Sequence, residues 1–230
     1  MFDLTPLDWL ALAWFIICWV GYTRYSGFNS PQTRNRLQDV LHTHIRQWVA
    51  TMHARDNRIV DTTIIANIER NATFLASSSL LIIAGLTTAL GSSEKVDALL
   101  SDLPFASTAS NHWELGIVLM LVAFIHAFFT FTWCVRQWGF ASILVGSAPN
   151  ITDEGISDEA RQKHQDALAQ IIWLAIYHFN VGLRAYYFSL ALIAWFIHPV
   201  AFIAASSWVV AVLYRREFRS RTLKALHMRS

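Results

Sequence analysis

Fixed charge is scarce in this sequence, and that scarcity decides its class. Only 15% of the 230 residues are Asp, Glu, Lys or Arg, against about 25% in an average soluble chain. Hydrophobic residues make up 54%, and the mean hydropathy is +0.36. This composition argues against a soluble globular domain and is typical of an integral membrane protein. The net charge of +2 is too small to indicate nucleic-acid binding.

Cysteine and catalytic motifs are nearly absent as well. The two cysteines, Cys18 and Cys134, lie inside apolar segments, so we expect buried thiols and no disulfide framework. No CxxC or His/Cys cluster in the sequence indicates structural zinc. The sequence also lacks GxSxG, HExxH and a glycine-rich phosphate loop, which makes a hydrolytic enzyme the least favoured interpretation. We therefore expect no catalytic activity and no cofactor.

Long apolar runs predict five membrane-spanning helices. They occupy residues 7–22, 72–90, 114–135, about 171–198 and 199–214. The last two share a run without fixed charge, Ala185–Tyr214, which as one helix would be about 45 Å long, whereas the hydrocarbon core is about 30 Å thick. His198-Pro199 lies at its centre and predicts a break, because proline fits the first position of a helix. A four-span protein with one kinked last helix is the alternative.

The positions of the cations set the expected orientation. Lys and Arg cluster in the segments 24–70, 136–163 and 215–229, whereas 91–113 is acidic. The positive-inside tendency places all three basic clusters in the cytoplasm. Five crossings of a bacterial inner membrane satisfy it, with the N-terminus outside and the C-terminus in the cytoplasm. The four-span alternative leaves the basic C-terminal tail outside.

One segment between the first two apolar runs predicts a helix outside the bilayer. Ser30-Pro31 is typical of a helix start, with the serine as N-cap. Apolar residues then recur at three- and four-residue steps from Leu37 to Met52, as on one face of an amphipathic helix. We expect an all-α fold, with a single membrane domain over 1–230 and a cytoplasmic helical insert over about 30–70.

Polar residues in or beside the apolar runs are the candidate functional residues. The second run is rich in hydroxyl and small side chains, which either pack against another helix or line a hydrated path. An arginine and amides at the mouth of such a path would favour anions. The pore or polar-network candidates are Asn67, Asn71, Ser77, Ser78, Asn180 and Arg184.

Three histidines within the apolar runs form a second group of candidates, namely His126, His178 and His198. Membrane haem proteins often use histidines on facing helices as iron ligands. However, intramembrane histidines are also common as hydrogen-bonded packing residues, and no paired ligand spacing is present here. A haem or redox protein is therefore only the third hypothesis, and we expect no metal site.

Three stretches resemble a family of membrane proteins, domain-of-unknown-function family 599. They are NIERNATFLASSSLLIIAGL at 67–86, NVGLRAYYFSLALIAWF at 180–196 and VAVLYRREFRS at 210–220. They occur in the same order, and the plan of apolar runs matches over nearly the whole chain. The resemblance implies a multi-pass membrane protein of this size. It implies no established activity, so no catalytic residue is carried over.

The sequence favours a homo-oligomeric channel or transporter, with anions as the candidate substrate. One subunit is small for an internal transport path, so the pore would lie between copies. The alternative is a non-catalytic scaffold or accessory subunit of a larger membrane complex. The expected partners are the lipid bilayer, further copies bound through membrane helices, and a partner membrane protein. Nucleic acid is not among them.

Overall fold

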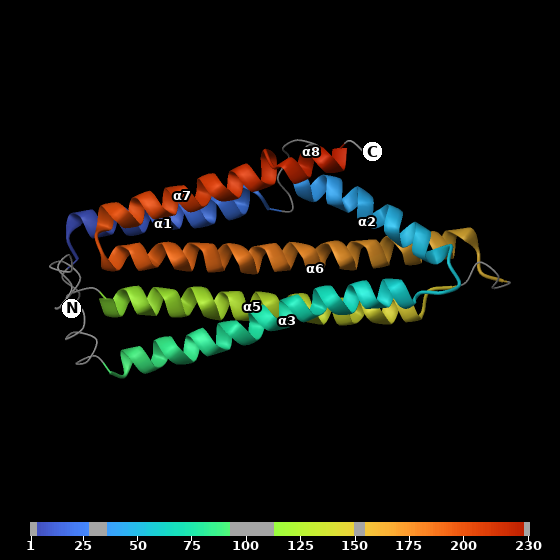
Figure 1. Cartoon of the computed structure of the whole chain (residues 1–230), viewed down its shortest axis with the longest axis horizontal. Coiled ribbons are helices and arrows are strands. Elements are labelled where there is room, and N and C mark those ends of the chain that lie inside the picture. The colour runs from blue at the N-terminus through green and yellow to red at the C-terminus, as the bar shows by residue number, and fades with distance from the viewer. Residues whose placement is uncertain (1–3, 28–35, 93–112, 150–154, 228–230) are drawn as a thin grey trace. The chain divides into compact units, whose positions relative to one another are not determined.

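The computed structural model describes residues 4–27, 36–92, 113–149 and 155–227 (Figure 1). Within these ranges the chain forms helices joined by short turns, without any strand. The predicted all-α fold is therefore confirmed. The expected helix start at Ser30-Pro31 and most of the acidic segment 91–113 lie outside the described residues.

The helices contain the apolar runs of the sequence, and α3, α5 and α6 extend well beyond them. In chain order they are α1 (Pro6–Tyr25), α2 (Leu37–His53), α3 (Ile59–Leu90), α5 (Trp113–Gly146), α6 (Asp158–Ile193), the 3-10 helix η2 (Ala194–Phe196), α7 (Pro199–Phe218) and α8 (Arg221–His227). By length and composition, α1, α3 and α5 could each cross a membrane. The count of five spans stays a prediction.

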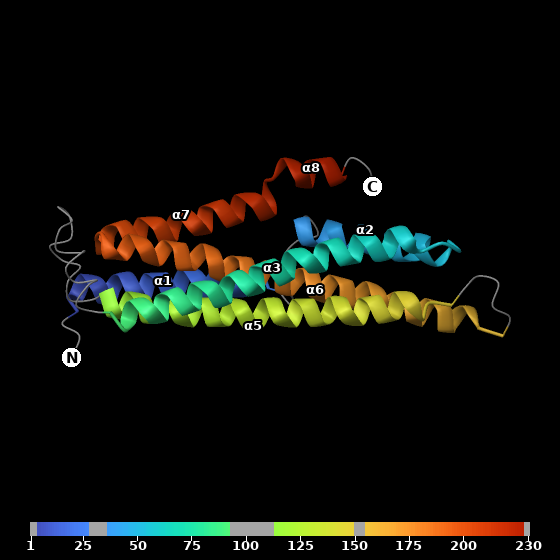
Figure 2. The same ribbon diagram turned by 60° about the horizontal axis from the view of Figure 1, so that its bottom comes forward.

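The break predicted at His198-Pro199 is confirmed. α6 ends at Ile193, η2 follows, and Pro199 is the first residue of α7, where its missing N–H leaves no helical hydrogen bond unmade. The backbone N–H of Val200 donates to Nδ1 of His198 at 3.1 Å, so the histidine satisfies a free donor of the first turn. Figure 2 shows the chain reversing direction between α6 and α7.

The start of α6 differs from the sequence prediction. We expected the fourth apolar helix to begin near Ile171, whereas α6 begins at Asp158. Ser157 accepts a hydrogen bond from the backbone N–H of Ala160 at 3.2 Å, and acidic residues occupy the first turn. Both features stabilise a helix N-terminus. The polar segment 158–169 therefore continues into the apolar one without interruption.

The chain divides into two compact units, which are described separately. Unit 1 comprises 1–31, 77–128 and 181–215, and unit 2 comprises 32–76, 129–180 and 216–230. The long helices α3, α5 and α6 contribute residues to both units. Each unit has its own hydrophobic core. The prediction of a single membrane domain over the whole chain stays a prediction.

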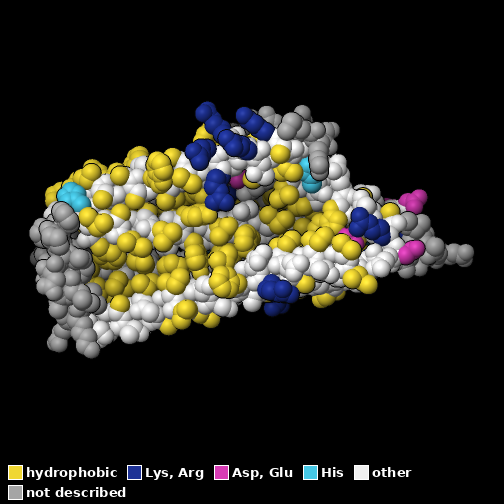
Figure 3. All heavy atoms as spheres, in the orientation of Figure 1, with side chains coloured by type: hydrophobic (Ala, Val, Ile, Leu, Met, Phe, Trp, Pro, Cys, Tyr) yellow, Lys and Arg dark blue, Asp and Glu magenta, His cyan; other side chains and the backbone are white. Residues whose placement is uncertain are grey.

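The core of unit 1 is built around aromatic rings. The ring of Phe15 in α1 lies 5.9 Å from that of Phe188 in α6 and 5.1 Å from that of Phe202 in α7. Trp195 stacks on Phe202 at 5.4 Å. Such pairs add to the stabilisation that comes from burying their area. Outside this core, apolar side chains also cover much of the face of unit 1 that Figure 3 displays.

The core of unit 2 includes the apolar face of α2. Val40, Ile45, Val49 and Met52 are buried, which confirms the amphipathic stripe read from their spacing. Ile45, Val49 and Met52 share one core with residues of α3, α5 and α6. Cys134 lies there too, and its thiol donates to the carbonyl of Ala175 at 3.1 Å. Both cysteines of the chain are buried and free, as expected.

Candidate functional site

Fixed charge in unit 1 lies near the ends of its helices, with the exception of Arg184 inside α6. Its described residues include five such charges, Asp8, Arg24, Glu114, Arg184 and Arg215. Asp8 and Arg24 lie at the two ends of an uncharged stretch of α1, which is about 24 Å long by helix rise. The stretch of α7 before Arg215 has the same length. An apolar zone therefore separates an acidic end of unit 1 from a basic end.

The acidic end is organised by Asp8, whose side chain is 1% exposed. One of its oxygens accepts from the backbone N–H and the hydroxyl of Thr5, at 3.0 and 2.6 Å. The other accepts from the indole N–H of Trp195 at 3.0 Å. The bond from the Thr5 backbone and the reciprocal bond from the N–H of Asp8 to Oγ1 of Thr5, at 3.3 Å, form a capping box that starts α1. The contact with Trp195 joins that start to η2. Asp8 is therefore a structural carboxylate that joins two segments 187 residues apart.

The basic end contains the sequence candidate Arg184, which is 4% exposed. Its guanidinium carbon lies 5.5 Å from the centre of the Tyr22 ring in α1, which is cation–π geometry. Nη1 of Arg184 has no hydrogen-bond partner among the described residues. A buried cation with an unused donor is costly unless something compensates its charge. An anion near the Tyr22 ring would provide that compensation.

The candidates on α3 are divided between the two units. Asn67 and Asn71 belong to unit 2 and are exposed. Ser77 and Ser78 belong to unit 1, where Ser77 is exposed and Ser78 is half-buried. Ser79, one of the hydroxyl residues of the second apolar run but not among the pore candidates, is buried, and its hydroxyl lies 2.9 Å from that of Tyr186 in α6. Its position on the opposite face from Ser77 could have been read from helical periodicity.

Asn180 lies in α6 within unit 2, where it is half-buried.

The three candidate histidines lie in different surroundings. His126 is exposed in unit 1, with its ring 6.3 Å from that of Trp19. His198 is exposed at the start of α7. His178 in unit 2 donates through Nδ1 to the carbonyl of Leu174 at 2.8 Å. A search of the described residues found no group of three or more His, Cys, Asp or Glu side chains that could hold a metal ion.

Unit 2 contains a histidine pair that sequence analysis missed. Nδ1 of His53 donates to the carbonyl of Val49 at 2.9 Å, so Nε2 of the neutral ring accepts from Nδ1 of His164 at 3.0 Å. Burial is the main cause that lowers the pKa of both rings, and the charge of Arg58 lowers both further. The pair is therefore a neutral hydrogen-bonded contact between α2 and α6.

An arginine next to this pair, Arg58, caps the C-terminal end of α5. Arg58 donates to the carbonyls of Ala148 and Pro149 at 2.6 and 3.1 Å, and Nη1 lies 3.4 Å from the carbonyl of Val145. These carbonyls lie at the negative end of the helix dipole, where a cation is stabilising. Arg58 therefore has a structural role in unit 2.

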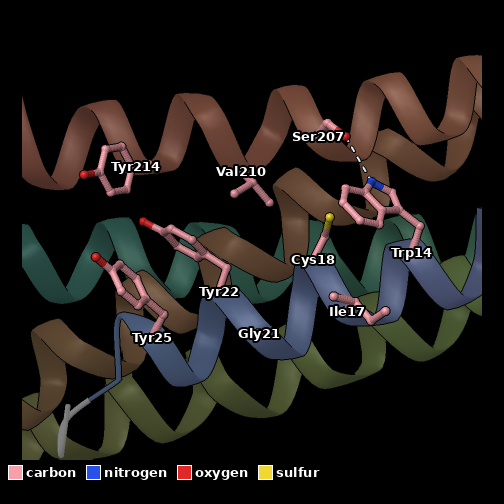
Figure 4. A pocket seen from close by; sticks show the side chains of 9 residues that line it. All are labelled: Trp14, Ile17, Cys18, Gly21, Tyr22, Tyr25, Ser207, Val210 and Tyr214. Atoms are coloured by element: carbon pink, nitrogen blue, oxygen red, sulfur yellow. Dashed lines mark hydrogen bonds between the residues drawn. The ribbon is translucent and has the colours of Figure 1, made fainter.

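Unit 1 also has an apolar groove between α1 and α7 (Figure 4). Its volume is about 420 Å³. Trp14 and Ser207, joined by a hydrogen bond of 3.0 Å, lie toward one end. Three tyrosines lie toward the other. The full lining is Trp14, Ile17, Cys18, Gly21, Tyr22, Tyr25, Ser207, Val210 and Tyr214. In the sequence, the residues that indicate this groove are Tyr25 beside Arg24 and Tyr214 beside Arg215.

Comparison with known families gives one match. The family model described as "Protein of unknown function, DUF599" matches residues 10–222. The chain belongs to this family. The match runs from α1 into α8, and so it confirms the family resemblance inferred from the three sequence stretches. No curated protein and no solved structure matches this DUF599 chain. Membership in the family assigns no role to any residue.

Proposed function

We propose that this DUF599 protein is a non-catalytic membrane scaffold that self-associates through the outward face of α3. In this proposal unit 1 crosses a cell membrane with five helical segments. Asp8 and Glu114 lie outside, and Arg24 and Arg215 lie in the cytoplasm. The N-terminus is then outside and the C-terminus inside. The uncharged stretches of about 24 Å in α1 and α7 support this arrangement, because short spans are accommodated by snorkelling arginines.

The observation that carries the proposal is the exposure of α3. Only 11% of its most apolar stretch is buried, against 28% for α1 and 44% for α5. Phe74 and Leu81 are 69% and 77% exposed, and Ser77, Ala84 and Gly85 are exposed on the same side. Small residues let a second helix approach closely within a bilayer. Large neighbours then pack against that helix.

The hydroxyl groups on α3 favour a dry contact over a water-filled one. Thr73, Thr87 and Thr88 each donate to a carbonyl of their own helix four residues earlier, at 2.8 to 3.0 Å. Their donors therefore need no water and no partner side chain. Together with the exposed Phe74 and Leu81, this pattern supports a packing surface. In a self-associating scaffold, this surface would be the contact between two copies.

Disulfide cross-linking in membranes tests the proposal. In a background with Cys18 and Cys134 replaced by alanine, Ser77→Cys and Ala84→Cys should each give oxidant-dependent dimers, because a symmetric contact brings equivalent positions together. Val122→Cys on α5 and Leu190→Cys on α6 are matched controls, since both positions are 57% exposed in unit 1. Equal cross-linking at all four positions, or none on α3, would show that α3 is not the contact.

A channel for anions is the second candidate function. It is favoured by the exposed polar side chains of α3, namely Asn67, Asn71 and Ser77. Chloride flux through protein in liposomes separates the two functions. Flux that falls in Asn67→Leu and Ser77→Leu would establish the channel. Unchanged leakage in wild type and both variants, together with α3 cross-links, would leave the scaffold as the function.

A further inference from the structure

The groove between α1 and α7 has the length and polarity of a site for one acyl chain. Trp14 and Tyr25 are eleven residues apart in α1, which corresponds to about 16 Å of helix rise. The hydrocarbon part of one leaflet is about half of a 30 Å core. Ile17, Cys18 and Val210 line the groove, and Gly21 contributes no side chain. A Cβ placed on Gly21 meets nothing within 4 Å, so the space beside it is open.

The tyrosine end of the groove carries positive charge. Tyr25 follows Arg24 in α1, and Tyr214 precedes Arg215 in α7. Both arginines are exposed. Tyrosines and arginines at the ends of apolar helices belong to the interface between lipid and water. A chain that enters the groove from this interface would therefore place its headgroup beside two cations.

Arg184 adds a third cation near the same end. The Tyr22 ring lines the groove and also lies 5.5 Å from the guanidinium carbon of Arg184. That guanidinium is buried, and its Nη1 has no hydrogen-bond partner among the described residues. A negative charge at the tyrosine end would offset this buried charge. The site thus favours an anionic amphiphile over a zwitterionic one.

We propose that this groove binds an anionic phospholipid, with one acyl chain between α1 and α7 and the phosphate beside Arg24 and Arg215. A free phosphate would leave the apolar part of the groove unfilled. A helix from a second copy would fill it but would not supply the negative charge. The proposal depends on the membrane location of unit 1, which belongs to the proposed function, and is independent of contacts through α3.

Lipid retention measured by native mass spectrometry tests the apolar part of the site. Purified protein is offered phosphatidylglycerol or phosphatidylcholine with identical chains. Wild type should retain one phosphatidylglycerol in preference to phosphatidylcholine. Gly21→Phe should abolish this retention, because its ring fills open space in the groove. Gly85→Phe is the matched control, since a Cβ there also meets nothing within 4 Å and Gly85 lies on α3.

The headgroup end is tested by removing its charge. The double variant Arg24→Gln, Arg215→Gln should bind phosphatidylglycerol about thirty-fold more weakly, since each basic residue near an anionic surface contributes a factor of about five. Arg70→Gln, Arg136→Gln removes the same charge from exposed positions in unit 2 and should leave binding unchanged. Short-chain phosphatidylglycerol and inorganic phosphate are compared as competitors, and only the lipid should compete.

Several outcomes would overturn the lipid site. Retention by Gly21→Phe at the wild-type level would place the lipid elsewhere, and equal retention of the two lipids would remove the anionic headgroup. Competition by inorganic phosphate alone would reduce the site to an anion site. Loss of α3 cross-links in Gly21→Phe, with lipid retention unchanged, would make a second copy the occupant. Loss of cross-links only in Gly85→Phe concerns α3 and leaves the lipid site standing.

Discussion

Unit 1 and unit 2 have similar interiors and different surfaces. Both enclose apolar cores to which several helices contribute. Unit 1 exposes large apolar side chains such as Ile17 and Trp208, and its few fixed charges other than Arg184 lie toward the helix ends. Unit 2 also exposes large apolar side chains, such as Phe129 and Ile143, but it carries surface ion pairs as well, for example Arg46 with Asp166 and Lys163 with Glu159, at 3.2 and 2.8 Å. The surface, and not the core, distinguishes the two units.

The difference in fixed charge can be followed along the helices that the two units share. α3, α5 and α6 each contribute residues to both units. Along α6 the exposed side chains change from charged in unit 2 to apolar in unit 1, whereas α5 exposes large apolar side chains, such as Val122 and Phe129, in both units. A core is apolar in water and in lipid alike. A large exposed apolar surface, in contrast, is stable only where another protein or lipid covers it. The exposed residues of unit 1, and not its core, therefore indicate what surrounds it.

The largest expected effect comes from breaking the buried polar contact in unit 1. Asp8→Ala removes a carboxylate that accepts hydrogen bonds from Thr5 and Trp195. We expect a loss of about 3 kcal/mol in the free energy of unfolding, because bonds to a charged group in a dry site are strong and the indole donor is left unpaired. Thermal unfolding in detergent, followed by near-UV circular dichroism, measures it. Glu114→Ala removes an exposed carboxylate from the same unit and should cost little. Equal losses in the two variants would refute the structural role of Asp8.

The corresponding contact in unit 2 should have a smaller effect. Arg58→Met removes the donors to Ala148 and Pro149 at the end of α5. We expect a loss of about 2 kcal/mol, because Arg58 is only half-buried and water can reach the freed carbonyls. Arg70→Met, at an exposed position in the same unit, is the control. Hydrogen exchange of the last turn of α5 should rise in Arg58→Met alone. Protection there that stays at the wild-type level would show that the arginine does not cap the helix.

Local features of the fold were predictable from the sequence because their causes are local. The spacing of Val40, Ile45, Val49 and Met52 predicted the buried face of α2. Pro199 predicted the break before α7. The predicted start of α6 near Ile171 was wrong because hydropathy marks only the apolar part of the helix, whereas Ser157 and the acidic first turn stabilise a helix start at Asp158.

Contacts between distant residues were not predictable. His53 and His164 are 111 residues apart, and no local pattern marks either as the partner of the other. Arg184 was singled out because it borders an apolar run, but its neighbour Tyr22 depends on how α1 packs on α6. The groove likewise requires α1 and α7 to lie together. Hydrophobic periodicity specifies which face is buried and leaves open what covers it.

The histidine pair makes unit 2 sensitive to acid. The pKa values of His53 and His164 are lowered mainly by burial, and Arg58 lowers both. The folded state therefore binds fewer protons than the unfolded chain, so stability is fully present above about pH 6.5 and falls as the pH drops below that value. Melting temperatures at pH 7.5 and 5.5 measure the loss. His164→Leu should reduce the pH dependence, and part of it should remain because burial also lowers the pKa of His53 and of His42. An undiminished pH dependence in His164→Leu would assign the effect to other groups.

The smallest expected effect tests how tightly unit 1 is packed near η2. An alanine Cβ at Gly116 would lie 2.7 Å from Cε1 of the Phe196 ring, so the ring must move. The contact is with the far end of a side chain, which can rotate, and alanine also favours the helix by about 0.5–1 kcal/mol. We expect Gly116→Ala to lose less than about 1 kcal/mol, because overpacking slightly exceeds the gain in helix propensity. Gly139→Ala in unit 2 has open space and should gain stability. If both variants gain the same stability, the ring of Phe196 moves aside without cost. The packing at Gly116 then contributes nothing to the difference between the units.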